Sequence, residues 1–231
     1  IRKPTDGMKV FTDDEKSTKS RQMVLELLVT DQPTKQDCHD PESHFWKMAK
    51  KVNVSESRFE RREKNEVPIA DNSHVAMAVN LDACIHCNLC VRACREVQSN
   101  DVIGMSNRGH TSKVVFDFND PMGESTCVSC GECVQACPTG ALMESSLLDE
   151  YGKKIVKPER TVDSLCPYCG VGCQLTYNIK DEKIVSVDGR EGPANQNRLC
   201  VKGRFGFDYV HNPQRLTKPL IRKDGVAKDP K

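Results

Sequence analysis

Twelve of the thirteen cysteines fall into three groups of four, and their spacing suits metal ligands. The first two groups share the spacing C-x2-C-x2-C-x3-C, and each cysteine of the second lies 43 positions after its counterpart in the first. The groups are Cys84, Cys87, Cys90 and Cys94, then Cys127, Cys130, Cys133 and Cys137, then Cys166, Cys169, Cys173 and Cys200. The repeated spacing, with Pro138 after the second group, is typical of bacterial iron–sulfur ligation. The sequence therefore predicts an electron-transfer protein with three 4Fe–4S clusters.

The fourth cysteine of each repeated group is expected to serve the cluster of the other group. Three cysteines at x2 intervals let a short loop wrap one cluster, but a fourth thiolate on the same tight loop would collide with that cluster. Cys94 lies four positions after Cys90, so a helix there would carry it along one face and away from its own loop. We therefore expect two crossed ligand sets. One set is Cys84, Cys87, Cys90 and Cys137, and the other is Cys94, Cys127, Cys130 and Cys133.

Zinc and disulfides are the alternative uses of so many cysteines. A disulfide framework does not explain a strict repeat at 43 positions, and the cysteine count is odd. Zinc binds paired C-x2-C units, but it has no use for a third cysteine at x2 and a fourth at x3 in both copies. The third group, considered alone, suits zinc better than the first two do.

Composition and charge exclude several classes of protein. The chain has 34 basic and 33 acidic residues and a formal net charge of +1, without the strongly basic character of a nucleic-acid-binding protein. No run of apolar residues is long enough to span a membrane, and no signal peptide is visible. Many free thiolates indicate a reducing compartment, so we expect a cytoplasmic protein.

The elements that must position the cysteines predict an α+β fold in four parts. Residues 1–70 are expected to be helical, with an amphipathic helix over 13–29 that starts at a capping box from Thr12 to Glu15. Residues 71–145 are expected to form a bacterial-type ferredoxin domain for two 4Fe–4S clusters. The 43-residue repeat there predicts strand, cluster loop, short helix and strand twice, with an added hairpin that includes 111–118.

A polar linker over 146–164 is expected to lead to the last part, residues 165–231. Two strands are predicted there, over 174–179 and 183–187, around a turn at Asp181 and Glu182. A short helix over 205–211 should stop before Pro213.

The third cysteine group and its surroundings closely resemble the opening of the molybdopterin oxidoreductase family. The resemblance rests on the run from Cys166 to Cys173, on Leu199 to Arg204, and on the continuation over 207–222. It implies that Cys166, Cys169, Cys173 and Cys200 bind a 4Fe–4S cluster beside a molybdenum or tungsten bis-molybdopterin guanine dinucleotide. It also implies that Lys202 lies between cluster and pterin as an electron relay. From the residues alone, a lysine two positions after a ligand is more often a solvated surface charge.

The order of the parts resembles the large, catalytic subunit of cytoplasmic NAD-dependent formate dehydrogenases. The resemblance implies that electrons from formate oxidation to CO2 pass through the three clusters to an iron–sulfur partner subunit that binds flavin and NAD. The formate-binding residues and the protein ligand of the metal are then expected beyond Lys231. Two alternatives stay open: another molybdopterin oxidoreductase, such as an assimilatory nitrate reductase, and a stand-alone ferredoxin-like electron carrier.

The N-terminal part, residues 1–70, resembles a region that carries 2Fe–2S and His/Cys-ligated clusters in the same family and in the large iron–sulfur subunit of complex I. Here the sequence departs from the pattern, because Gln32 stands where the family has a histidine and Cys38 has no cysteine nearby. We expect this region to hold no cluster and Cys38 to be a buried or spare thiol. A mononuclear metal at Cys38, His39 and His44 is the alternative.

Overall fold

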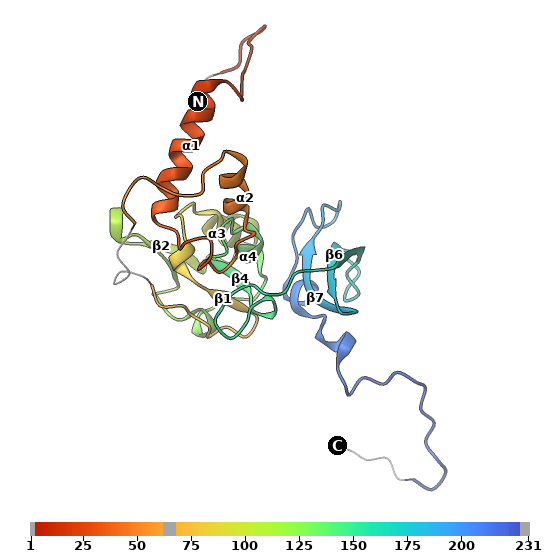
Figure 1. The fold of residues 1–231 in the computed structure, drawn as a ribbon. Helices are drawn as coiled ribbons and strands as arrows, with labels where there is room; N and C mark the ends of the chain where they lie inside the picture. Colours follow the sequence, from red (N-terminus) through yellow and green to blue (C-terminus); the bar gives the residue numbers. More distant parts are fainter. Residues whose placement is uncertain (1–2, 62–67, 227–231) are drawn as a thin grey trace.

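The computed structural model describes residues 3–61 and 68–226, in which a larger body lies beside a smaller module built on a three-stranded sheet (Figure 1). The helices are α1 (Glu15–Thr30), α2 (His44–Lys51), α3 (Leu89–Arg92), α4 (Glu132–Ala136) and α5 (Val201–Phe205). The strands are β1 (Met77–Val79), β2 (Ile103–Ser106), β3 (Lys113–Phe116), β4 (Leu142–Glu144), β5 (Arg160–Leu165), β6 (Gln174–Lys180) and β7 (Lys183–Gly189). The expected mixture of helices and strands is confirmed. Among the described residues, no helix is both long and apolar enough to cross a membrane.

Helix α1 projects from the body, and only part of it packs (Figure 1). Its N-cap is Asp14, whose carboxylate accepts the backbone N–H groups of Lys16 and Ser17, so the helix starts later than a capping box at Thr12 requires. The sequence places an apolar stripe of Met23, Val24, Leu27 and Leu28 on this helix. That stripe is only partly packed, since Val24 and Leu27 are 54% and 48% exposed. The packed stripe contains Leu25, Leu28 and Val29, which meet the aromatic residues of α2. The helix is thus rotated from the predicted orientation, because α2 covers it from one side only.

The body contains two copies of one unit, and the first strand of the first copy pairs with the last strand of the second. Strand β1 pairs antiparallel with β4, the last strand of the second half, so that Met77 lies opposite Glu144 and Val79 opposite Leu142. Strands β2 and β3 form the hairpin expected between the halves. One apolar core contains side chains from both halves, including Met77, Val91, Phe116 and Leu142, together with several of the cysteines. Two cysteine-bearing loops that are far apart in sequence therefore share one core.

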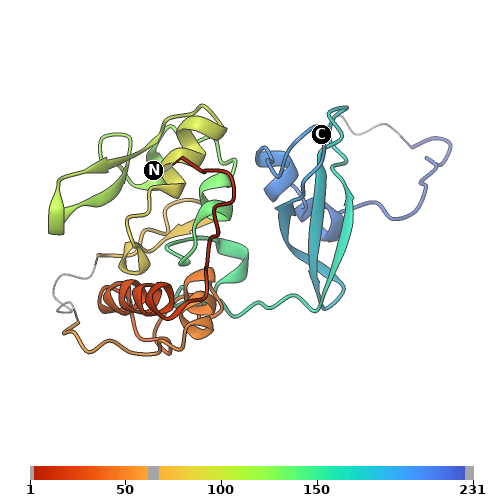
Figure 2. The ribbon, with the colours of Figure 1, turned by 90° about the horizontal axis from the view of Figure 1, so that it is seen from above.

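The smaller module differs from the prediction at both ends. Strand β5 starts at Arg160 and pairs with β6 along its whole length, so the predicted linker over 146–164 ends in a strand. Strands β6 and β7 form the expected hairpin around Asp181 and Glu182. The helix predicted over 205–211 is instead α5 followed by a separate 3-10 turn at Asp208–His211, because α5 ends at Gly206. Seen from above, this module lies next to the body along the side that carries α4 (Figure 2).

Candidate iron–sulfur sites

The first of the two crossed ligand sets surrounds a small apolar pocket in the body. Its four cysteines are Cys84, Cys87, Cys90 and Cys137, and the aliphatic side chains around them include Ile85 and Val114. Burial, together with the neighbouring Cys137, Cys84 and Cys87, raises the pKa of the Cys90 thiol to about 12. A thiolate in this pocket therefore needs a nearby cation such as a bound metal.

The second crossed ligand set surrounds a second small pocket. Its cysteines are Cys94, Cys127, Cys130 and Cys133, and Val102, Ile103 and Val128 lie around them. Burial raises the pKa of the Cys133 thiol well above its usual value, and Cys130, Cys127, Cys90 and Cys94 add to the effect in that order. The structure thus brings Cys94 to the loop of the second group and Cys137 to the loop of the first, in the grouping that crossed ligation requires.

A change of helix type brings Cys94 to the second pocket. Helix α3 ends at Arg92 and continues as a π-helical turn, η3 (Ala93–Val97), which contains Cys94. The wider turn is a form that often occurs at functional sites. The Cys94 sulfur accepts the backbone N–H of Val102, which lies just before strand β2, at 3.3 Å.

Matching backbone hydrogen bonds reach the first sulfur of each repeated group. The N–H of His86 donates to Cys84 Sγ and the N–H of Ser129 donates to Cys127 Sγ, both at 3.4 Å. His86 and Ser129 also share a left-handed backbone, with φ of 54° and 57°. Hydrogen bonds to sulfur are one of the means by which proteins stabilise reduced iron–sulfur clusters. The donor set and its surroundings therefore fit such clusters.

The third group of thiols lies in the smaller module and is more open. Cys169 and Cys200 are exposed, while Cys166 and Cys173 are half-buried. Burial raises the pKa of Cys173, and Cys166, Cys169 and Cys200 raise it further, so the four thiols are electrostatic neighbours. Lys202 follows on α5 and is exposed.

Among the described residues, no set of three or more His, Cys, Asp or Glu side chains is arranged to hold one metal ion. Around zinc, four thiolates share one metal at about 2.3 Å. In a 4Fe–4S cluster, each thiolate binds a different iron, so the ligands stand farther apart.

Arg204 is the residue of this region that the sequence reasoning did not single out. Its side chain is 1% exposed and lies where α5 of the smaller module meets the loop of the second cysteine group. Its guanidinium donates to the carbonyl of Cys130 and forms an ion pair with Glu132. The sequence offered only a basic residue after a cysteine motif, because the acidic partner is 72 positions away.

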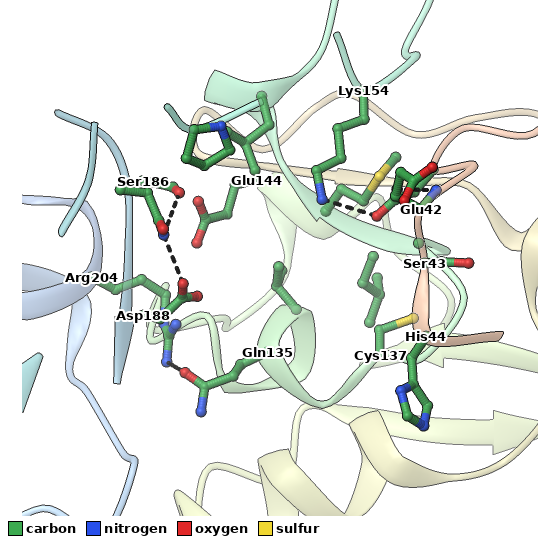
Figure 3. Close-up of a pocket in the computed structure, with 18 residues that line it drawn as sticks. Glu42, Ser43, His44, Gln135, Cys137, Glu144, Lys154, Ser186, Asp188 and Arg204 are labelled. Atoms are coloured by element: carbon green, nitrogen blue, oxygen red, sulfur yellow. Dashed lines mark hydrogen bonds and ion pairs between the residues drawn. The ribbon is translucent and has the colours of Figure 1, made fainter. Parts of the chain in front are cut away.

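A cavity of about 310 Å³ lies between the body and the smaller module. Figure 3 shows the Glu144 side chain in it, with Asp188 and Arg204 on one side and Lys154 on the other. Glu144 is 6% exposed. Burial is the main reason that the pKa of Glu144 is raised to about 7. Among its charged neighbours, Arg204 lowers this pKa, Asp188 raises it, and Lys154 lowers it.

The N-terminal residues that depart from the family pattern are used in packing. Gln32 is 4% exposed and donates to the carbonyl of Ala83, next to the first cysteine group. Cys38 is 3% exposed, and burial, followed by Asp40, raises its pKa to about 11. His39 Nδ1 is 2.8 Å from the carbonyl oxygen of Gly152. Of the predicted region over 1–70, residues 1–2 and 62–67 lie outside the described residues.

Two family models match the chain. Residues 83–141 match a 4Fe-4S dicluster domain, and residues 159–212 match a molybdopterin oxidoreductase Fe4S4 domain. These matches confirm the expected order of the two iron–sulfur domains.

Curated relatives extend the likeness at about one third identity. A Staphylococcus haemolyticus protein named "Putative formate dehydrogenase" is 35% identical over 184 residues, which are 62% of this chain and 18% of that protein. An NADH-quinone oxidoreductase subunit of Rhizobium meliloti is 33% identical over 229 residues, which are 96% of this chain and 26% of that protein. The chain thus spans about a fifth to a quarter of the length of these relatives.

A solved structure of an NAD+-reducing NiFe hydrogenase in the H2-reduced state has a similar fold. The TM-score is 0.55 at 22% sequence identity, over 62% of this chain and 61% of that one. Together, the matching family models and the relatives make this chain similar to iron–sulfur regions of molybdopterin oxidoreductases.

Proposed function

We propose that this chain is the electron-transfer portion of a formate dehydrogenase catalytic subunit. It would carry electrons from formate oxidation, at a molybdenum or tungsten bis-pterin site, through three 4Fe–4S clusters to a partner subunit that binds flavin and NAD. The observation that supports this most is the gathering of twelve thiols into three neighbouring groups. The protein would work in the cytoplasm, where thiolates stay reduced.

The chain's own residues would hold each cluster by four thiolates. One set is Cys84, Cys87, Cys90 and Cys137, a second is Cys94, Cys127, Cys130 and Cys133, and the third is Cys166, Cys169, Cys173 and Cys200. When bound, the clusters supply one-electron transfer. The aliphatic walls of the first two pockets exclude water, and the backbone N–H groups of His86 and Ser129 stabilise charge on sulfur.

The contacts between the groups support one order of electron transfer. The smaller module meets the second group through Arg204 and the carbonyl of Cys130. The second group meets the first, since Cys90 is close enough to Cys133 to raise its pKa. The first group ends at the surface, where Cys87 is exposed. Electrons would therefore pass from the third group to the second, then to the first, and leave beside Cys87.

The open side of the third group would face the pterin. Cys169 and Cys200 are exposed there, and Lys202 follows them on α5. A lysine ammonium at this position would hydrogen-bond the pterin and favour the reduced cluster. The formate-binding residues would lie outside residues 1–231.

A second candidate function is a cluster-bearing subunit of a complex that exchanges electrons with NADH. It is favoured by the Rhizobium meliloti relative, whose likeness covers 96% of this chain and whose name is that of an NADH-quinone oxidoreductase. In that case the third group would still carry a cluster, but formate would not be the electron donor.

Anaerobic purification of the full protein, followed by metal analysis and addition of substrates, tests the proposal. We expect at least twelve iron and twelve sulfide per chain, four of each for each cluster held by residues 1–231, and reduction of the clusters by formate seen by paramagnetic resonance. Reduction by NADH but never by formate would select the second candidate. Zinc in place of iron would contradict both.

A further inference from the structure

Arg204 is the largest fully buried side chain among the described residues, although it carries a full positive charge. Its Nε donates to the carbonyl oxygen of Cys130 at 2.9 Å. Its Nη2 donates to Glu132 Oε1 at 2.7 Å and to Gln135 Oε1 at 2.9 Å. Arginine reaches several acceptors at once because its donors form a rigid planar fork. One residue of the smaller module thus holds the loop and the helix that carry the second cysteine group.

The Glu132 carboxylate also binds the stretch of chain just before Cys200. Glu132 Oε1 accepts the backbone N–H of Leu199 at 3.0 Å. Glu132 directly precedes Cys133, and Leu199 directly precedes Cys200. One hydrogen bond therefore joins the backbone next to a third-group cysteine to the side chain next to a second-group cysteine.

Two glutamines of the body extend the contact on either side. Gln135 Oε1 also accepts the N–H of Gly189, and its Nε2 donates to the carbonyl of Asn197 at 3.0 Å. Gln98 donates to the carbonyl of Leu199 at 3.3 Å. The polar contacts of the body thus converge on the chain just before Cys200.

We propose that Arg204 and Glu132 are positioning residues that hold the third cysteine group against the second and thereby set the rate of electron transfer between their clusters. This inference rests on the proposed function, because it requires a cluster in each group. The buried ion pair is suited to this role because each charge compensates the other. Loss of either partner leaves a buried, uncompensated charge, and the contact between the smaller module and the second group must then rearrange. The first and second groups share one apolar core within the body, so that core, more than Arg204, sets their separation.

Arg204→Lys tests the role of the fork with the charge retained. Lysine carries a compact ammonium and cannot reproduce the planar arrangement. We expect electron transfer between the second and third clusters to slow roughly tenfold or more, the scale seen for outer-shell partners of metal sites. The magnetic coupling between these two clusters, measured by paramagnetic resonance of the reduced holoprotein, should weaken. The coupling between the first and second clusters should stay unchanged and serves as the internal control.

A matched control variant is Arg160→Lys. Arg160 pairs with Glu182 at 2.8 Å in the same module, but both side chains are well exposed. Such surface pairs contribute little. This variant should leave both couplings and the transfer rate unchanged.

Glu132→Gln tests the pair from the other side and keeps a side-chain oxygen of similar size. The effects of the two variants should not add, because each weakens the same contact, Glu132→Gln by removing the negative charge and Arg204→Lys by removing the planar donors. The double variant should therefore transfer electrons about as slowly as Arg204→Lys. If Arg204→Lys loses iron, Glu132→Gln alone decides the question.

An unchanged transfer rate in the variants that keep their clusters would overturn the proposal. Equal weakening of both couplings would also overturn it, since it would indicate general loosening. A holoprotein with about eight iron atoms and no third-group signal would instead refute the proposed function. Dithionite reduces the clusters directly and without formate. A protein that does not oxidise formate can therefore still be used in this test.

Discussion

Asn88 and Gly131 hold the same left-handed backbone conformation at matching points of the two repeated loops, 43 positions apart. Their φ and ψ angles are 61° and 9° in Asn88, and 74° and 7° in Gly131. Each follows the second cysteine of its group and precedes a helix, α3 or α4. Their surroundings differ, because Asn88 is exposed whereas a Cβ on Gly131 would collide with the Arg204 side chain. The two loops therefore keep the same backbone, and their surroundings differ where the second loop meets the smaller module.

Replacing Gly131 by alanine should cost more stability than replacing Asn88 by alanine. Gly131→Ala puts an L side chain on a left-handed backbone, which costs about 1–2 kcal/mol relative to glycine, whereas Asn88→Ala already starts from an L residue. Gly131→Ala should cost about 1–3 kcal/mol more through overpacking against Arg204. Anaerobic denaturant unfolding of the two variants checks this difference. Equal losses would contradict this prediction.

Replacing Cys94 by alanine should damage the cluster held by Cys127, Cys130 and Cys133. Cys94 lines the pocket of those three cysteines. Cys137→Ala should instead damage the cluster whose other ligands are in the first group. Paramagnetic resonance of the two variants distinguishes the clusters, and Cys38→Ala is a control that removes a buried thiol outside both pockets. Loss of the sequence-local cluster in each variant would refute crossed ligation.

If the proposed function is right, Lys202→Ala in the full-length protein should leave the iron content nearly unchanged and slow the flow of electrons from formate to the clusters. Its exposed position on α5 gives it little part in folding. Lys202→Arg should restore the rate only in part, because the guanidinium is larger and planar. Iron analysis and rapid-mixing reduction by formate measure the two effects. Full formate-dependent reduction in the alanine variant would show that Lys202 is only a surface charge.

Glu144 should make the protein less stable as the pH rises from about 4.5 to about 7. Burial raises its pKa from 4.5 to about 7, so in this range the unfolded chain ionises Glu144 and the folded chain does not. The folded state then binds more protons, and the free energy of unfolding falls with rising pH, by up to about 3 kcal/mol.

Glu144→Gln should remove this component of the pH dependence. The two proteins should have similar stability near pH 4.5, and the variant should be the more stable at pH 7 and above. Anaerobic urea unfolding at several pH values compares them. A constant difference across the range would show that Glu144 titrates normally in the folded protein.

Local sequence features determined the chemistry and many of the elements. The cysteine spacing alone indicated iron–sulfur ligation, and the matching family models support it. The hairpin of β6 and β7 also followed from short-range signals, since alternating residues and the turn at Asp181 lie within one stretch of chain. The sequence could determine these features because the interactions that specify them lie within a few residues of one another.

Tertiary packing decided the features that join distant parts of the chain. The orientation of α1 depended on which of its faces α2 covers, and the starting point of β5 depended on pairing with β6. The burial of Arg204 depended on Glu132, which lies 72 positions away. Nothing in the local sequence distinguishes Glu132 from an acidic residue on the surface. A charged residue is stable in the interior only where the fold brings its partner to it, and no local spacing records that meeting.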